Sequence, residues 1–184
     1  MSRNCSGQPR PPAAPRCRPP ELSRAWLIGN ALWMQAAWWA CVLSERHPWL
    51  LLPVVAGLLV HLAACPRPRD EATTLVCVGL TGWLLDAGLG ALGVFDFTSQ
   101  PLPLWLALLW LVLASGLRNS LAWARRPVWY GALLGLCGGP LAYLAGAKLA
   151  GVGLPLGTLG TTLLLAPLWA VWLPLILRMA APRA

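Results

Sequence analysis

The sequence predicts an all-α fold, a polytopic transmembrane helical bundle of about six spans with both ends of the chain on the cytoplasmic side. Hydrophobic residues make up 58% of its 184 positions and charged residues only 11%, less than half of the roughly 25% found in soluble domains. So few charges cannot cover the surface of a soluble fold. The apolar residues form long runs without the alternation of a barrel strand, and helices satisfy their own backbone inside a bilayer.

Six apolar runs of the chain are separated by short polar or proline-containing connections. A helix needs roughly 20 residues to cross a hydrocarbon core of about 30 Å, and most of the runs approach that length. The shorter second run, Trp49 to Ala64, is expected to extend to Pro48 and Cys65. The predicted spans are residues 25–43, 48–65, 72–94, 102–122, 128–147 and 156–177 of a membrane domain covering 25–178. The flanking segments are a disordered, basic, Pro/Arg-rich cytoplasmic tail (1–24) and a short cytoplasmic tail (179–184).

The distribution of lysine and arginine predicts the orientation. Of these fourteen residues, only Arg46 and Lys148 fall on one predicted side, and the other twelve fall on the side of the two chain ends. Positive charge favours the cytoplasmic side, so the N-terminus and C-terminus are both predicted to lie there. The formal net charge of +8 sits in short connections and tails rather than on one basic face. Anionic lipid headgroups are therefore the expected partner, and nucleic acid is not expected.

Asp86 is the most costly residue to place in the predicted third span. It lies about 12 Å from the outer end of that span at 1.5 Å per residue. An ionised carboxylate at such a depth costs about 2.5–3.5 kcal/mol, so the side chain is expected to face the bundle interior. Two interpretations remain open. Asp86 either contributes to an ion, proton or cationic-substrate site, or it is a structural carboxyl hydrogen-bonded to a neighbouring helix.

The predicted fifth span combines small residues with a central proline. Small faces let helices approach closely, and a proline in mid-helix is expected to kink or unwind the chain. Unwound backbone beside a carboxylate is a feature of transporter sites. The two small faces are Gly131, Gly135 and Gly139 and, separately, Gly138, Ala142 and Gly146. The candidate polar intramembrane site comprises Asp86, Gly138, Gly139, Pro140 and Tyr143.

Four further polar residues are secondary candidates. Asn30 and Gln35 in the first span are expected to form hydrogen bonds across helices. His61 near the inner end of the second span is either a satisfied interfacial histidine or a member of a proton relay. Arg118 lies within snorkelling reach of the cytoplasmic surface, where Asp70 or Glu71 can pair with it.

Catalytic residues, cofactor-binding residues and metal ligands were not identified. The chain lacks Gly-x-Ser-x-Gly, His-Glu-x-x-His and a phosphate-binding glycine loop followed by lysine. None of the six cysteines forms a Cys-x-x-Cys pair, and we expect no histidine at ligand spacing from a cysteine, hence no metal and no cofactor. Small apolar packing residues are the expected role of the cysteines. An enzyme is disfavoured on these grounds.

A set of short motifs lies along the membrane region: Asn30, Trp38-Trp-Ala-Cys-Val-Leu43, His61-Leu62, Glu71, Asp86 before a glycine-rich helix end, Leu104-Trp105, Leu109-Trp110, Arg118-Asn-Ser-Leu-Ala-Trp123 and Gly138-Gly-Pro-Leu-Ala-Tyr-Leu-Ala-Gly146. Together these motifs resemble a bacterial multi-pass membrane family, domain of unknown function 2878, over about residues 28–178. The resemblance implies a protein of the bacterial inner membrane, and it implies no activity, substrate or cofactor.

Three functional hypotheses follow from the sequence. The first is a small transport-type or lipid-associated bundle with a polar centre at Asp86, Tyr143 and the backbone around Pro140. The second is an accessory or assembly protein whose small-residue faces bind helices of a partner membrane protein or of a second copy. The third, an enzyme at the membrane surface, would need Asn30, His61 and similar polar residues around one cavity.

Overall fold

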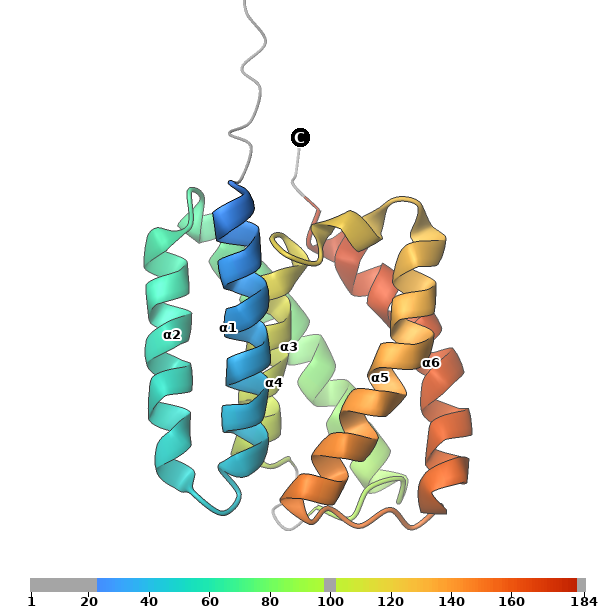
Figure 1. Ribbon diagram of the computed structural model, residues 1–184. Coiled ribbons are helices and arrows are strands. Elements are labelled where there is room, and N and C mark those ends of the chain that lie inside the picture. Colours follow the sequence, from blue (N-terminus) through green and yellow to red (C-terminus); the bar gives the residue numbers. More distant parts are fainter. Residues whose placement is uncertain (1–22, 98–101, 182–184) are drawn as a thin grey trace, which may run out of the picture.

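A computed structural model describes residues 23–97 and 102–181, and this part of the chain folds into six α-helices (Figure 1). The all-α fold class is confirmed. Nearly all of the predicted 1–24 tail and half of the predicted 179–184 tail lie outside the described residues. The α-helices are α1 (Arg24–Leu43), α2 (Leu51–Ala64), α3 (Pro68–Ala91), α4 (Leu104–Leu117), α5 (Val128–Ala150) and α6 (Gly157–Met179), with 3-10 turns η1 (Pro48–Leu50) and η2 (Ala122–Arg125).

Three of the helices, α3, α5 and α6, are long and apolar enough to cross a membrane. Helix α2 and helix α4 have 14 residues each, which corresponds to about 21 Å and is shorter than the hydrocarbon core of about 30 Å. Helix α1 has 20 residues but carries four tryptophans together with Asn30 and Gln35. The protein is therefore a helical membrane protein in which the helices differ in length and polarity.

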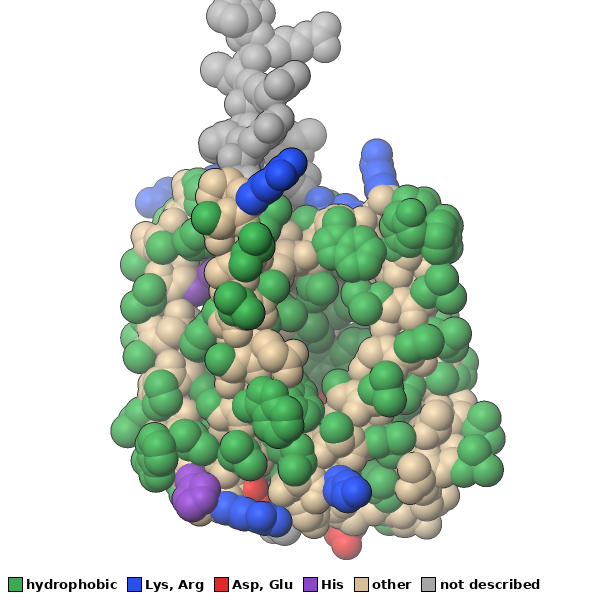
Figure 2. Space-filling view, viewed as in Figure 1, with side chains coloured by type: hydrophobic (Ala, Val, Ile, Leu, Met, Phe, Trp, Pro, Cys, Tyr) green, Lys and Arg blue, Asp and Glu red, His purple; other side chains and the backbone are tan. Residues whose placement is uncertain are grey.

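The outer surface of the bundle is apolar over most of its height. Large apolar side chains such as Leu52, Leu84 and Leu159 are more than 70% exposed. In Figure 2 hydrophobic side chains cover the sides of the molecule, whereas lysine and arginine lie at its two ends. Such a distribution is costly in water and matches a surface that contacts lipid. The first described residues and the last lie at the same end (Figure 1), called here the terminal end; the opposite end carries Arg46 and Lys148.

Local chemistry explains where several helices begin and end. The Ser23 hydroxyl caps α1 by accepting a hydrogen bond from the backbone N–H of Trp26 at 3.1 Å. Helix α3 begins at Pro68 and carries Asp70 and Glu71 in its first turn. A proline at the first position costs no helical hydrogen bond, because the N–H there has no partner in the helix. The two carboxylates are stabilised by the positive end of the helix dipole. Helix α3 therefore starts four residues before the predicted 72–94 span.

Helix α4 ends at Leu117 rather than at residue 122, the predicted end of the fourth span. The Asn119 side chain donates a hydrogen bond to the Ser115 carbonyl at 2.8 Å, and this carbonyl would otherwise accept the helical bond from the Asn119 backbone. That backbone N–H instead reaches the Gly116 carbonyl at 3.0 Å. Asparagine competes with helical bonds in this way, so the chain turns into η2.

Helix α5 is continuous through Pro140, which is buried. Of the two alternatives expected at Pro140, a kink or unwound backbone, the second is wrong; the axis of α5 changes direction part-way along its length (Figure 1). A proline inside a helix removes one hydrogen bond and bends the axis without ending the helix. Helix α6 lies along α5 and carries two prolines of its own, Pro167 and Pro174.

The remaining helices form the other half of the bundle. Helix α4 packs against α1, α2 and α3, and α3 crosses the molecule so that it also contacts α6. The two loops at the end opposite the termini pair through Asp96 and Gly153, whose backbones exchange hydrogen bonds at 3.0 and 3.2 Å. Helix α1 and helix α5 diverge toward the terminal end (Figure 1).

Candidate functional site

Asp86 lies in the interior of the bundle, as predicted, with 0% of its surface exposed. Its two carboxyl oxygens each accept one hydrogen bond from an aromatic side chain. The Tyr143 hydroxyl of α5 donates to Oδ1 at 2.7 Å, and the Trp110 indole Nε1 of α4 donates to Oδ2 at 2.6 Å. The carboxyl group therefore joins α3 to two other helices at one depth.

Stacked aromatic rings surround this carboxyl group. The Trp110 ring stacks on Trp169 of α6 with centroids 5.5 Å apart, and Tyr143 stacks on Phe95 at 5.5 Å. Tyr143 also contacts Trp169 at 5.7 Å. Ring pairs at these separations are favourable beyond their burial. The rings exclude water and hold the two hydrogen-bond donors in place, so Asp86 and its aromatic neighbours form one rigid unit, called here the Asp86 cluster (Asp86, Trp110, Tyr143 and Trp169).

A cavity of about 380 Å³ lies beside the Asp86 cluster, between helices α1, α4, α5 and α6. Trp110, Tyr143 and Trp169 form part of its wall, whereas Asp86 stands behind them and does not line it. Gly138 and Gly139 line the cavity from α5, and Pro140 does not. The space-filling view is hollowed between the α1 and α5 halves of the molecule (Figure 2). The cavity therefore opens sideways, toward the apolar sides of the bundle.

The two small-residue faces of α5 have different neighbours. A Cβ atom at Gly135 would overlap the Trp169 backbone carbonyl, and one at Gly139 would overlap the Trp169 side chain. Helix α6 of the same chain thus occupies the face of Gly131, Gly135 and Gly139. The second face borders the cavity: Gly138 and Gly146 have no neighbour closer than 3.8 Å to an added Cβ.

Polar groups in the cavity wall are few. Gln35 of α1 lines the cavity, whereas Asn30, on the same helix, does not. The indole N–H groups of Trp105 and Trp169, both side chains of the wall, are buried and have no hydrogen-bond partner among the described residues. Buried donors are usually paired. Both nitrogens are enclosed by other atoms rather than open to the cavity, so an acceptor atom in the cavity would reach them only after the ring turns.

A second polar group lies at the terminal end and is centred on Glu71. Its Oε1 atom lies 2.9 Å from His61 Nε2 and accepts a hydrogen bond from Asn119 Nδ2 at 3.3 Å. Its Oε2 atom lies 3.4 Å from Arg118 Nε. Arg118 also reaches Asp70 at 3.5 Å, so the predicted pairing of Arg118 with these acids is confirmed. We call Glu71, His61, Arg118 and Asn119 the Glu71 network.

Helix α1 joins the Glu71 network through two side chains. Trp26 donates its indole hydrogen to Asn119 Oδ1 at 2.9 Å and stacks on His61. Asn30 donates to the Ser115 carbonyl at 3.2 Å and accepts from the Ser120 hydroxyl at 2.6 Å. The prediction that Asn30 bonds across helices is confirmed. The network therefore ties α1, α2, α3 and α4 together at one end.

Glu71, His61 and Asn119 are buried. The pocket that Arg118 lines is formed otherwise by residues outside the network and has a volume of about 30 Å³, room for water but not for a substrate. A membrane-surface enzyme would need a cavity among Asn30, His61 and Arg118, and the large cavity lies between other residues. The arrangement at this end supports a structural role.

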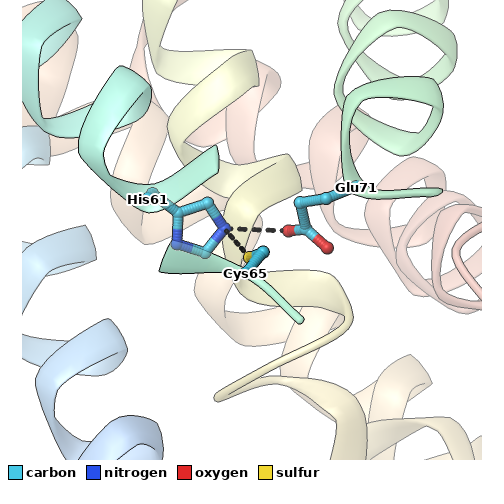
Figure 3. Close-up of side chains that lie close together, drawn as sticks. All are labelled: His61, Cys65 and Glu71. Atoms are coloured by element: carbon cyan, nitrogen blue, oxygen red, sulfur yellow. Dashed lines mark hydrogen bonds and ion pairs between the residues drawn. The ribbon is translucent and has the colours of Figure 1, made fainter. Parts of the chain in front are cut away.

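Cys65 stands close to the same histidine (Figure 3). Its sulfur lies 3.5 Å from His61 Nε2, because the two residues are four apart and lie at the end of α2. The expectation that no histidine stands at ligand spacing from a cysteine is therefore wrong. Three potential ligand atoms, from His61, Cys65 and Glu71, lie within 4.8 Å of one another, and all three residues are buried.

Four members of the Asp86 cluster and the Glu71 network were not predicted as site residues: Trp110, Trp169, Glu71 and Asn119. Trp110 appears only in a motif of the family resemblance, and nothing in its local sequence or in that of Trp169 indicates a partner on another helix. Asn119 follows Arg118 directly, and an asparagine next to a helix-terminating arginine was a usable signal. Glu71 was named only as a partner of Arg118 and as a residue of the resemblance, although its place four residues before Leu75 on the buried face of α3 could have revealed it.

These features define a class: a small helical membrane protein with a buried carboxyl cluster beside a sideways-open apolar cavity. Over residues 27–175 the chain matches the family described as "Protein of unknown function (DUF2878)", and it belongs to that family. The resemblance drawn from the sequence motifs is thereby confirmed. No curated protein and no solved structure matches the chain.

Proposed function

We propose that this protein is a lipid-associated bundle of the bacterial inner membrane that holds the apolar chain of a lipid between α1 and α5. The observation that carries the proposal is the cavity of about 380 Å³, which falls within the range of about 300–1,000 Å³ found for small-molecule sites. Its wall is built from aromatic and aliphatic side chains. Because its opening lies on the apolar side of the bundle, lipid chains are the molecules that reach it.

The Asp86 cluster supports a binding wall rather than an ion pathway. Both oxygens of Asp86 already accept hydrogen bonds, and its side chain stands behind the cavity wall. A carboxyl group in that position fixes the orientation of Trp110 and Tyr143 and leaves no free oxygen toward the cavity. We therefore assign Asp86 a positioning role in lipid binding.

The free indole donors favour a lipid with an oxygen acceptor near its chain. Trp105 and Trp169 have buried N–H groups without a partner among the described residues. If one ring turns toward the cavity when lipid binds, a carbonyl or ester oxygen of the lipid would pair with its N–H. Such a pairing removes the cost of about 1–3 kcal/mol of an unsatisfied buried group. An acyl ester is the simplest membrane lipid group that provides this acceptor.

The test compares two neighbouring positions of α5 in the full chain. Ala142 lines the cavity, whereas the adjacent Leu141 is 67% exposed on the outside of the bundle. Each is replaced by tryptophan, and the lipid retained after purification in detergent is identified and counted by native mass spectrometry. Ala142→Trp is expected to lose the retained lipid, and Leu141→Trp to keep it. Equal retention by both variants would contradict the proposal.

For the topology we propose six spans, with the terminal end in the cytoplasm and its arginines at anionic headgroups. Support comes from the placement of both described ends on one side of the bundle and from the bias of twelve of fourteen basic residues toward that side. A reporter enzyme fused after Arg183 tests it. Activity in the cytoplasm is expected, and activity in the periplasm would refute the cytoplasmic placement of the terminal end.

A further inference from the structure

We propose that His61, Cys65 and Glu71 form a binding site for a divalent transition-metal ion of the zinc class at the terminal end of the bundle. The three ligand atoms converge there: Figure 3 shows the Glu71 carboxylate and the Cys65 sulfur both directed at His61 Nε2. Nitrogen, thiolate sulfur and carboxylate oxygen are the ligands that zinc takes in proteins. The site is separate from the lipid cavity and does not depend on the proposed function.

The two separations from His61 Nε2 are close to those around a tetrahedral ion, and the Cys65 and Glu71 ligand atoms lie within 4.8 Å of each other. Ligands at zinc–nitrogen and zinc–sulfur bond lengths lie about 3.6 Å apart at a tetrahedral angle, and His61 Nε2 lies 3.5 Å from Cys65 Sγ. The matching nitrogen–oxygen separation is about 3.4 Å, against 2.9 Å between His61 Nε2 and Glu71 Oε1. The histidine and the glutamate therefore move apart by about 0.5 Å when the ion replaces their hydrogen bond.

The Nε2 atom of His61 faces two hydrogen-bond partners, Glu71 Oε1 and Cys65 Sγ. His61 Nε2 carries at most one hydrogen, so it can donate to Glu71 or to Cys65 but not to both. A metal ion satisfies all three atoms at once. On binding, the imidazole hydrogen moves from Nε2 to Nδ1 by exchange with solvent, Nε2 offers its lone pair to the ion, and the thiol proton of Cys65 leaves to solvent.

The charges of the ligands balance the charge of a divalent ion at this buried site. A thiolate and a carboxylate carry two negative charges, which neutralise a divalent ion, and neutral imidazole adds none. The remaining charge, on Arg118, lies 3.5 Å from Asp70 and binds the other oxygen of Glu71, Oε2. Glu71 thus keeps Oε1 for the ion, while Arg118 and Asn119 hold the carboxylate in place as outer partners of the kind that tune metal sites. Three protein ligands leave the fourth position of the ion to water.

The test uses the full chain in lipid nanodiscs with Co²⁺ as a spectroscopic substitute for Zn²⁺. One equivalent of Co²⁺ is expected to bind and to give a sulfur-to-cobalt charge-transfer band in the near ultraviolet. Cys65→Ser should remove that band. His61→Gln should weaken binding by at least tenfold, because the loss of a residue that only supports a ligand already weakens metal binding by roughly 10–100-fold. Cys77→Ser and Cys137→Ser are the matched controls, because both cysteines are exposed; Cys77 lies six residues after Glu71 on α3 and Cys137 on α5. Both variants should keep the band.

Folding of each variant is checked by its thermal unfolding without metal, and Zn²⁺ provides a second measurement. Because Zn²⁺ would bind the folded state, it should raise the unfolding temperature of the wild type and of both control variants but not that of Cys65→Ser. The proposal is overturned if Co²⁺ gives no thiolate band, if Cys65→Ser keeps the band, or if Zn²⁺ stabilises that variant as much as the wild type.

Discussion

Among the described residues two carboxyl groups are buried, those of Glu71 and Asp86, and their surroundings differ. Glu71 lies in the first turn of α3 and is held by a guanidinium, an imidazole and an amide. Asp86 lies fifteen residues further along the same helix and is held by a phenol and an indole. The first thus has a cationic partner, and the second has neutral partners only.

The difference follows from depth. Near the end of the bundle an arginine can reach a carboxylate and keep part of its side chain close to water; Arg118 is 14% exposed and also contacts Asp70. Deeper in the membrane a second charge would add its own insertion cost, so neutral donors that are themselves apolar rings are the cheaper partners. Depth therefore selects the chemistry with which a helix stabilises an acid.

The largest expected effect comes from removing the acid with the cationic partner. Glu71→Ala leaves Arg118 and His61 without their buried partner and should lower the free energy of unfolding by about 3–5 kcal/mol. Asp70→Ala is the matched control, because the adjacent Asp70 also pairs with Arg118 but is 51% exposed; it should cost about 0–1 kcal/mol. Unfolding titrations in mixed micelles measure both. Equal losses would remove the distinction between buried and exposed partners.

Removing the acid with neutral partners should cost less. Asp86→Ala leaves the Tyr143 hydroxyl and the Trp110 indole unpaired. Neutral donors fall in the lower part of the range of about 1–3 kcal/mol for an unsatisfied buried group, so we expect a total of about 2–4 kcal/mol for the two by the same titration. Asp86→Asn should cost less than Asp86→Ala, because its amide oxygen still accepts from one donor. An alanine variant as stable as the wild type would show that the Asp86 cluster is not held by these bonds.

The third prediction concerns the helix face that packs against the Asp86 cluster. Gly135→Ala places a methyl group against the Trp169 backbone and should cost about 1–3 kcal/mol through overpacking. Gly138→Ala, three residues on, meets nothing closer than 3.8 Å and should change stability by less than about 0.5 kcal/mol. Thermal unfolding in detergent separates the two. A partner protein bound at Gly135, as the accessory hypothesis requires, would instead show as loss of a complex with stability unchanged.

The smallest effect is expected at the edge of the Glu71 network. Trp26→Phe keeps a ring against His61 but removes the hydrogen bond to Asn119, at about 0.5–1.5 kcal/mol. Trp39→Phe is the control, because Trp39 lies on the same helix and is 46% exposed. A loss at position 26 no larger than the loss at position 39 would mean that α1 is held by packing alone.

The sequence predicted the parts of this structure that depend on local pattern. Long apolar runs gave the helices, the cost of a carboxylate in a membrane placed Asp86 inside, and glycines every four residues marked the face on which α6 packs. Tyr143 was named with Asp86, and the structure brings the two into contact. Each of these inferences needs only the spacing of residues along one helix or the free-energy cost of burying one polar group.

What the sequence could not predict depends on how helices pair. Trp110 meets Asp86 because α3 and α4 lie side by side at one particular register, and no local pattern encodes that register. The cavity exists because α1 and α5 diverge, which follows from the packing of all six described helices. His61 and Cys65 are a different case: their spacing of four residues is visible in the sequence, and a ligand pair could have been read from it.

The end of α6 is fastened by residues from much earlier in the chain. Arg118 donates to the Ala180 carbonyl at 3.4 Å, and Arg125 donates to the Leu177 carbonyl at 3.1 Å. During synthesis these two arginines leave the ribosome more than fifty residues before the carbonyls that receive them. Until then the glycine face of α5 also lacks its cover. The insertion machinery must therefore hold an incomplete bundle in which the glycine face of α5 is uncovered. A ribosome that stalls before residue 177 releases a product with this face exposed, and quality-control proteases can distinguish it from the complete fold.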